Sequence, residues 1–329
     1  MNQQKIVVLG TGGTLAGTAA DPQDHLGYRA GQLPVAQVLA SIPALRGQSL
    51  AAEDIAQVDS KDMGFEVWQR LAQRCAHWLA RDEVAGIVVG HGTDTLEETA
   101  FFLHSVLAPA KPVVLTCAMR PATALAPDGP QNLVDAIAVA AAPGARGVVA
   151  VCAGTIHGAE DVAKQHTWRL DAFSSGDAGP LGYVEQRALR MVRPWPAGGA
   201  RPGLLERAVG CARWPRVEIV MSHAGAGGAL VEALLAQGVD GLVVAATGNG
   251  TVHAGLEAAL LQAMERGVPV VRASRCGQGR VQSTPHDRLP HAGALSPVKA
   301  RIALLLDLLA AGAGYASLST TPGPAAPAP

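Results

Sequence analysis

Two short segments place threonine hydroxyls directly after glycine-rich turns: Gly10 to Thr14 (GTGGT) and Gly90 to Thr95 (GHGTDT). A threonine hydroxyl is a poor nucleophile at neutral pH, and it attacks a carbonyl group only when a partner takes its proton. Lys164 could be that partner if the fold desolvates it beside a threonine and a carboxylate such as Asp94. Together these residue types indicate covalent catalysis by threonine, although their spacing in the sequence does not show that they meet.

Each of these features also has a purely structural interpretation. A glycine run after a strand is more often a plain turn, and Asp94 or Thr95, with Glu97 or Glu98 three residues later, fits a capping box at a helix start. A lone lysine is usually a solvated surface residue. His91 has no second His or Cys at ligand spacing, so we expect no metal site.

The first glycine run also invites comparison with nucleotide-binding loops. The dinucleotide fingerprint G-x-G-x-x-G requires glycine where this chain has Leu15, and no P-loop sequence follows. A nucleotide-dependent enzyme is therefore a weak alternative, and no cofactor is expected.

The elements that must position these residues are short apolar strands alternating with amphipathic helices. In the first part of the chain we expect strands over 5–9, 86–90, 112–116 and 147–152, and helices over 65–80, 96–107 and 131–142. Strands that are apolar throughout predict an α/β fold, with a parallel sheet covered by helices on both faces. Both threonine motifs then follow the carboxyl ends of strands, where open α/β sheets bind ligands.

The same alternation resumes after a segment rich in Pro, Gly and Arg, which predicts two domains of unequal size. We expect a larger N-terminal domain (1–190), a linker (191–215), a smaller C-terminal α/β domain (216–318) and a disordered Pro/Ala-rich tail (319–329). In the second domain the pattern predicts strands over 217–221, 241–246 and 268–272, with helices over 229–237, 254–266 and 297–311.

The composition narrows the class of protein. Of 329 residues, 49% are apolar and 16% are charged, which argues against a disordered chain. A net charge of −1 without a basic stripe argues against a nucleic-acid binder. We see no secretory signal and no apolar run long enough to span a membrane. Five scattered cysteines suit reduced, buried thiols, so we expect a cytoplasmic protein.

Four sequence motifs resemble those of the bacterial L-asparaginase/glutaminase family. They are TGGT (11–14), HGTDTLEETA (91–100), AMRP followed by DGP and N-L (118–133), and PLGYV (180–184). The similarity runs from the first strand to about Leu309. It implies hydrolysis of L-asparagine to L-aspartate and ammonia through a covalent acyl-enzyme, by subunits that form homodimers or homotetramers.

The resemblance also implies roles for individual residues. Thr14 would be the nucleophile, and Tyr28 would help to activate it. Thr93, Asp94 and Lys164 would form a second triad that relays protons and positions water. Backbone N–H groups near Thr14 and Thr93 would form the oxyanion hole.

On the substrate side, Ser60 would hold the α-carboxylate and Asp94 would pair with the α-ammonium. Three positions depart from the family: Lys61 stands where Gln or Glu is usual, Thr251 replaces an amide or small hydroxyl in G-N-G-[NS], and 274–287 contains no Glu. Asp287 could substitute for the missing Glu. These changes predict weaker binding of free asparagine, or preference for a substrate with an altered α-amino group.

Three other functions remain open at this stage. A glutaminase-asparaginase would accept the longer side chain, and a catalytically silent relative would bind an amino acid as a sensor. Retention of Thr14, Thr93, Asp94 and Lys164 argues against the sensor, because a pure binder needs no proton relay. The nucleotide-dependent enzyme is the third.

Overall fold

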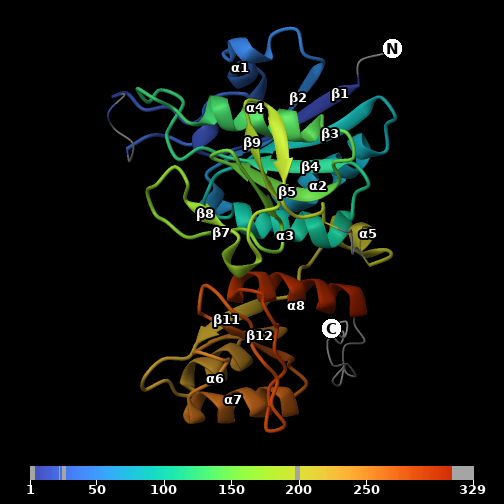
Figure 1. Cartoon of the computed structure of the whole chain (residues 1–329). Helices are drawn as coiled ribbons and strands as arrows, with labels where there is room; N and C mark the ends of the chain where they lie inside the picture. The colour runs from blue at the N-terminus through green and yellow to red at the C-terminus, as the bar shows by residue number, and fades with distance from the viewer. Residues whose placement is uncertain (1–3, 22, 24–26, 197–200, 313–329) are drawn as a thin grey trace. The chain divides into compact units, whose positions relative to one another are not determined.

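The chain divides into two compact units, residues 1–210 and 211–329. The structure is a computed structural model that describes residues 4–21, 23, 27–196 and 201–312 (Figure 1). Both units alternate strands with helices, as the apolar patterning predicts, so the α/β fold class is confirmed.

The first unit is built on an eight-stranded sheet. In spatial order its strands are β10 (Ala188–Met191), β9 (Gly182–Glu185), β6 (Thr155–Gly158), β5 (Gly147–Cys152), β4 (Pro112–Thr116), β3 (Val84–Gly90), β1 (Lys5–Gly12) and β2 (Leu50–Val58). Strands β2, β1, β3, β4 and β5 are parallel, whereas β6, β9 and β10 continue the sheet in antiparallel pairs. The expectation of a parallel sheet therefore holds for five strands and is wrong for three at one edge.

Helices cover both faces of this sheet, and Figure 1 shows α1 and α4 on one face with α2 and α3 on the other. The helices of the first unit are α1 (Val35–Ala40), α2 (Phe65–Leu79), α3 (Leu96–Leu107), α4 (Gly129–Ala140) and α5 (Leu204–Val209). One buried cluster joins alternate strand residues, such as Val8 and Val88, to Val38 of α1 and Leu133 of α4. Residues of opposite parity in the same strands face α2 and α3, because successive side chains of a strand point to opposite faces.

The α2 helix follows from its apolar spacing. Val67, Leu71 and Cys75 recur every fourth residue and are buried. Trp68 of α2 stacks on Phe102 of α3, with ring centroids 4.7 Å apart. These contacts hold the two helices that flank the second threonine motif.

The second unit has a three-stranded parallel sheet in the order β11, β12, β13. Its elements are β11 (Val217–Met221), α6 (Ala229–Ala236), β12 (Gly241–Ala246), α7 (Ala254–Glu265), β13 (Val270–Ser274) and α8 (Pro297–Ala311). Helix α8 begins at Pro297, and proline is favoured at the first position of a helix. Ser296, just before it, caps the helix by accepting a hydrogen bond from the Lys299 N–H at 3.5 Å. Every predicted element of this unit is present, although β13 begins and ends two residues later than expected.

Two other expectations need correction. The expected linker contains α5, which packs against α2 and α3, so this part of 191–215 belongs to the first unit. Among the five cysteines, Cys276 is exposed and Cys211 is half-buried, contrary to the expectation of buried thiols.

The predicted disordered tail, 319–329, lies outside the described residues. No helix in the described part of the chain combines the length and apolar character that a membrane crossing requires.

Candidate active site

The two threonine motifs meet backbone to backbone beyond the ends of β1 and β3. Gly13 has a φ of 73°, in the left-handed region that favours glycine. A Cβ atom at Gly13 would lie 2.4 Å from the Cα of Gly92, closer than any real contact. The GTGGT sequence is therefore required by close packing, and this contact brings the turns that carry Thr14 and Thr93 together.

Thr14 begins a short 3-10 helix (Thr14–Ala16) and is 4% exposed. Its Oγ1 lies 2.6 Å from the hydroxyl oxygen of Tyr28, in a hydrogen bond that either group could donate. Burial raises the pKa of Tyr28 above its usual value; the charges of Asp59 and Asp94 act in the same direction, and the bond to Thr14 opposes them. Tyr28 is therefore a neutral phenol at neutral pH.

Thr93, Asp94 and Lys164 form one hydrogen-bonded group. Lys164 Nζ donates to Thr93 Oγ1 at 2.9 Å and to Asp94 Oδ1 at 2.6 Å. Lys164 lies on β7 (Ala163–Lys164), which pairs with β8 (Phe173–Ser174), and its backbone N–H donates to Glu97 Oε1 of α3 at 3.3 Å. The lysine side chain is 20% exposed and the Asp94 side chain 50%, so Asp94 keeps an open side.

Ser60 lies directly against this group. It is 2% exposed, and its Oγ accepts a hydrogen bond from the Asp94 N–H at 3.1 Å. Thr95 is the N-cap residue of α3, but its hydroxyl donates to the Ser60 carbonyl at 2.7 Å and makes no side-chain cap. The capping-box interpretation of Thr95 is thus wrong: the hydroxyl is used to fix the serine turn to the threonine motif.

A buried hydrogen-bond chain beneath the second motif was missed in the sequence. Trp68 Nε1 donates to Thr99 Oγ1 at 2.9 Å, and that hydroxyl lies 2.9 Å from His91 Nε2. His91 Nδ1 lies 2.7 Å from the Gly92 carbonyl oxygen. The Gly92 carbonyl can only accept, so Nδ1 carries the proton; in a neutral ring Nε2 is then the acceptor, and the Thr99 hydroxyl donates to it. Burial lowers the pKa of His91 to about 4, so the ring is neutral and positions the Gly92 backbone.

The AMRP-DGP-N motif supports the ends of β4 and β5. The Asp128 carboxylate accepts hydrogen bonds from the Met119 and Arg120 N–H groups, each at 2.9 Å. Asn132 donates to the Cys117 carbonyl at 2.9 Å and accepts from the Ala153 N–H at 3.0 Å. This motif therefore fixes loops at the edge of the sheet where the threonines lie.

The positions that depart from the family pattern lie in different surroundings. Lys61 adjoins Ser60 and forms an ion pair with Asp62. Thr251 belongs to the second unit, where its N–H donates to the Thr247 carbonyl at 2.8 Å. Asp287 is engaged in that same unit by Arg272 and by the Thr284 N–H at 3.0 Å.

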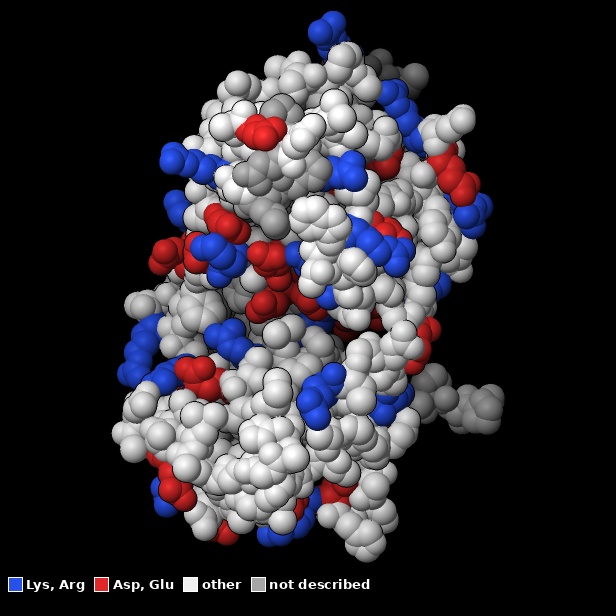
Figure 2. All heavy atoms as spheres, turned by 90° about the vertical axis from the view of Figure 1, so that its left-hand side faces the viewer, with Lys and Arg blue, Asp and Glu red and all other residues white. Residues whose placement is uncertain are grey.

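A cavity of about 380 Å³ opens beside the catalytic candidates, lined by Asp94, Lys164, Gln165, His166 and Thr167. Figure 2 shows basic and acidic side chains interspersed on the face that it presents, with no broad basic area. This distribution fits a small-molecule site better than a polyanion-binding face.

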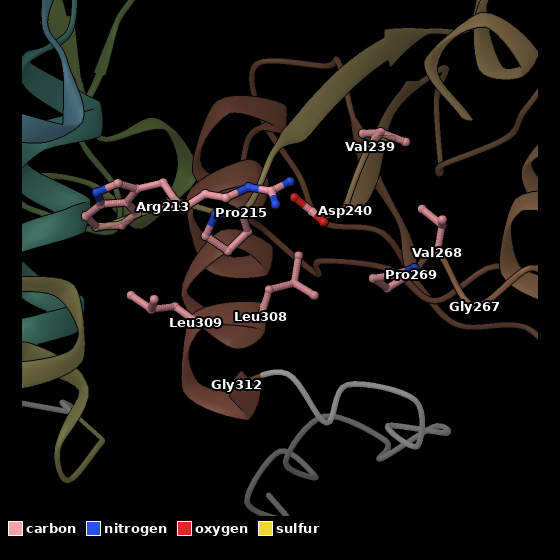
Figure 3. A pocket seen from close by; sticks show the side chains of 11 residues that line it. Arg213, Pro215, Val239, Asp240, Gly267, Val268, Pro269, Leu308, Leu309 and Gly312 are labelled. Atoms are coloured by element: carbon pink, nitrogen blue, oxygen red, sulfur yellow. The ribbon is translucent and has the colours of Figure 1, made fainter. Parts of the chain in front are cut away.

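A larger cavity, of about 630 Å³, lies in the second unit. Figure 3 shows Leu308 and Leu309 of α8 along it, with the Arg213 guanidinium turned toward the Asp240 carboxylate. Its described lining holds neither threonine nor lysine, so it does not match the predicted chemistry.

Comparisons with known proteins agree with this geometry. Residues 5–196 match the family model "Asparaginase, N-terminal", and residues 216–318 match "Glutaminase/Asparaginase C-terminal domain". The chain is 35% identical to L-asparaginase 2 of Bacillus subtilis (92% of this chain, 82% of that one). It is 34% identical to a glutaminase-asparaginase of Pseudomonas fluorescens (92% and 86%).

Among solved structures, a probable cytoplasmic L-asparaginase from Campylobacter jejuni superimposes with a TM-score of 0.86. It is 35% identical to this chain, and the match covers 92% of this chain and 94% of that one. Two family models together span most of the chain, and the relatives are matched over more than four fifths of their length. This chain therefore belongs to the asparaginase family.

Proposed function

We propose that this chain hydrolyses the side-chain amide of L-asparagine to L-aspartate and ammonia, through an acyl-enzyme on Thr14. The observation that best supports this is the convergence of two threonines, each with its own proton-transfer partner, at one backbone contact between Gly13 and Gly92. Two threonines with separate partners suit a reaction in two halves, acylation and deacylation.

In the first half, Thr14 Oγ1 attacks the amide carbon and a C–O bond forms. The hydroxyl proton passes to Tyr28, which as a neutral phenol accepts it only while it hands its own proton to the leaving nitrogen. Backbone N–H groups near Thr14 and Thr93 stabilise the oxyanion, a contribution of about 3 kcal/mol per donor. The C–N bond then breaks, and the leaving nitrogen takes a proton and departs as ammonia.

In the second half, water attacks the ester carbonyl. Thr93 orients that water, and the water proton passes through the Thr93 hydroxyl to Lys164, which acts as the neutral amine, while the Asp94 carboxylate stabilises the ammonium group that forms. The ester C–O bond breaks, aspartate is released, and the proton returns to Thr14 Oγ1.

Substrate selection in this proposal depends on the same turns. Ser60 Oγ faces the α-carboxylate, and the open side of Asp94 faces the α-ammonium. From the family motif, Thr251 is a further hydrogen-bond donor to the substrate in this proposal. Glutaminase-asparaginase activity is the second candidate, because several family relatives carry that name.

We also propose a cytoplasmic location and an assembly of two or four copies. The Campylobacter jejuni relative is described as cytoplasmic. Low charge and many apolar side chains are compatible with large interfaces between copies.

The test is ammonia release from L-asparagine, L-glutamine and D-asparagine, with Thr14→Ala and Thr14→Ser variants beside the unaltered protein. The Thr14→Ala variant should lose orders of magnitude in turnover, and Thr14→Ser should keep part of it because it keeps a hydroxyl. Binding of asparagine without ammonia release would instead favour the sensor. The ratio of turnover with glutamine to that with asparagine separates the two enzyme candidates.

A further inference from the structure

Lys61 stands at the edge of the candidate site, on a turn whose backbone is fixed. Its neighbour Ser60 is held by hydrogen bonds from the Asp94 N–H and the Thr95 hydroxyl. A Cβ atom at Gly92 would lie 2.4 Å from Ser60 Oγ, so the serine turn is packed directly on the second threonine motif. The Lys61 backbone therefore has a defined position beside Asp94.

The Lys61 side chain, by contrast, is free to change partner. Its side chain is 61% exposed, and the paired Asp62 side chain is 65% exposed. An ion pair between two such exposed neighbours contributes little, because water screens it. A substrate carboxylate beside Ser60 would therefore compete with Asp62 for the ammonium group.

Acidic neighbours keep this lysine charged. The hydrogen bond to Asp62 raises the pKa of Lys61, and the charges of Asp59 and Asp94 add to that effect. Lys61 thus presents a full positive charge near Asp94, whose own charge is already shared with Lys164. A substrate ammonium group at this place would be repelled by Lys61, and a substrate carboxylate would be attracted.

We propose that Lys61 is a specificity-determining residue that selects amides of dicarboxylic acids: substrates with a carboxylate beside Ser60 but without a free ammonium group next to it. This inference rests on the proposed function and names its substrate class. Succinamate, which is asparagine without its amino group, and N-acetyl-asparagine belong to this class. Lys61 and Ser60 then hold the carboxylate together, and the amide carbon lies within reach of Thr14.

The experiment measures kcat/KM for succinamate and for L-asparagine in the unaltered protein and in Lys61→Gln. We expect the ratio of the two values, succinamate over asparagine, to fall about tenfold in Lys61→Gln, which is about 1.4 kcal/mol. The change should appear in the KM for succinamate, because the carboxylate is bound before and during the reaction. Lys61→Arg should keep the ratio, since it keeps the charge.

Lys5→Gln is the matched control because it removes the same charge at the first residue of β1. The first threonine motif lies at the other end of that strand, about 23 Å away at 3.3 Å per residue. Lys5→Gln should leave the ratio unchanged. A ratio that changes less than twofold in Lys61→Gln, while the protein still releases ammonia from asparagine, would overturn the role of Lys61 alone. No ammonia from any of these amides would overturn the proposed function itself, so the two failures are distinguishable.

Discussion

Lys164 Nζ and Thr93 Oγ1 lie 2.9 Å apart, although the two residues are separated by 71 positions in the sequence. The contact exists because β3 ends at the second threonine motif, and the β7–β8 hairpin is held beside α3 by Glu97. A lysine is placed against a hydroxyl and a carboxylate at once, which is the arrangement that proton transfer requires.

Removing the Lys164 amino group should therefore impair turnover far more than binding. We expect Lys164→Met to lower kcat about 10² to 10⁴-fold, the usual contribution of a positioned acid or base, with a smaller change in KM. Lys111→Met is the control, since Lys111 donates to the Arg81 carbonyl before β4, at the other end of the strands. Steady-state ammonia release measures both. A Lys164→Met enzyme within tenfold of normal kcat would contradict the relay.

Tyr28 should act as a neutral phenol over the whole neutral range. Because its pKa is raised, its ionisation should appear only above pH 10, in the ultraviolet difference between the unaltered protein and Tyr28→Phe. The same variant should lower kcat about a hundredfold through loss of the bond to Thr14. A tyrosinate signal from this residue near pH 8 would show that it works as a phenolate base instead.

The close contact between the two motifs predicts a severe effect of a single methyl group. Gly13→Ala should lower the free energy of unfolding by about 3 kcal/mol and lower kcat more than tenfold, since the Gly92 backbone must move. Gly144→Ala is a control for positive φ, because its φ of 76° is close to that of Gly13, while no described atom beyond its own residue and its chain neighbours lies within 4 Å of its Cβ position. That control should cost only about 1 to 2 kcal/mol and keep full activity. Urea unfolding and ammonia release compare the two, and equal losses would contradict this role for Gly13.

His91 should make stability depend on pH in a defined window. Its pKa is about 4 in the folded protein and about 6.5 in the unfolded chain, so the unfolded state binds more protons between these values. The stability that comes from burying neutral His91 is therefore fully present above pH 6.5. It is lost progressively as the pH falls from 6.5 through 4. Between pH 7 and pH 5 it amounts to about 2 kcal/mol.

Urea unfolding at both pH values, in the unaltered protein and in His91→Gln, measures this term. His91→Gln should lose about 2 kcal/mol less than the unaltered protein between pH 7 and pH 5. His223→Gln, at an exposed histidine, should behave like the unaltered protein. Identical losses in His91→Gln would mean that His91 is not buried in its neutral form.

Much of the fold could be predicted because apolar runs identify strands that are buried on both faces. The bounds of β4, β5, β11, β12, α3 and α8 are those expected from the pattern. Strand β2 was missed because it lies at the edge of the sheet, where its residues are only partly buried and lack a continuous apolar run. Strands β6, β9 and β10 are short and antiparallel. Two-residue turns join β6 to β5 and β10 to β9, and only the pairing of β6 with β9 joins segments distant in the sequence.

The residues of the candidate site were predictable from their chemistry and from the family resemblance, not from apolar patterning. Residue chemistry identified Thr14, Thr93, Asp94 and Lys164 as one possible group, and only family resemblance brought in Tyr28 and Ser60. The positioning roles of Trp68, Thr99 and His91 were missed. Trp68 and Thr99 look like ordinary helix residues in the sequence, and His91 was weighed only as a metal ligand. Their hydrogen-bond chain exists only after α2 packs on α3.

The central claim is that Thr14 becomes esterified during turnover. Rapid acid quenching of the protein with L-asparagine, followed by proteolysis and mass spectrometry, tests it directly. The account predicts an aspartyl group on the peptide that contains Thr14, and its accumulation in Lys164→Met, where deacylation is slowed. An aspartyl group on any other side chain, or none while ammonia is being released, would contradict it.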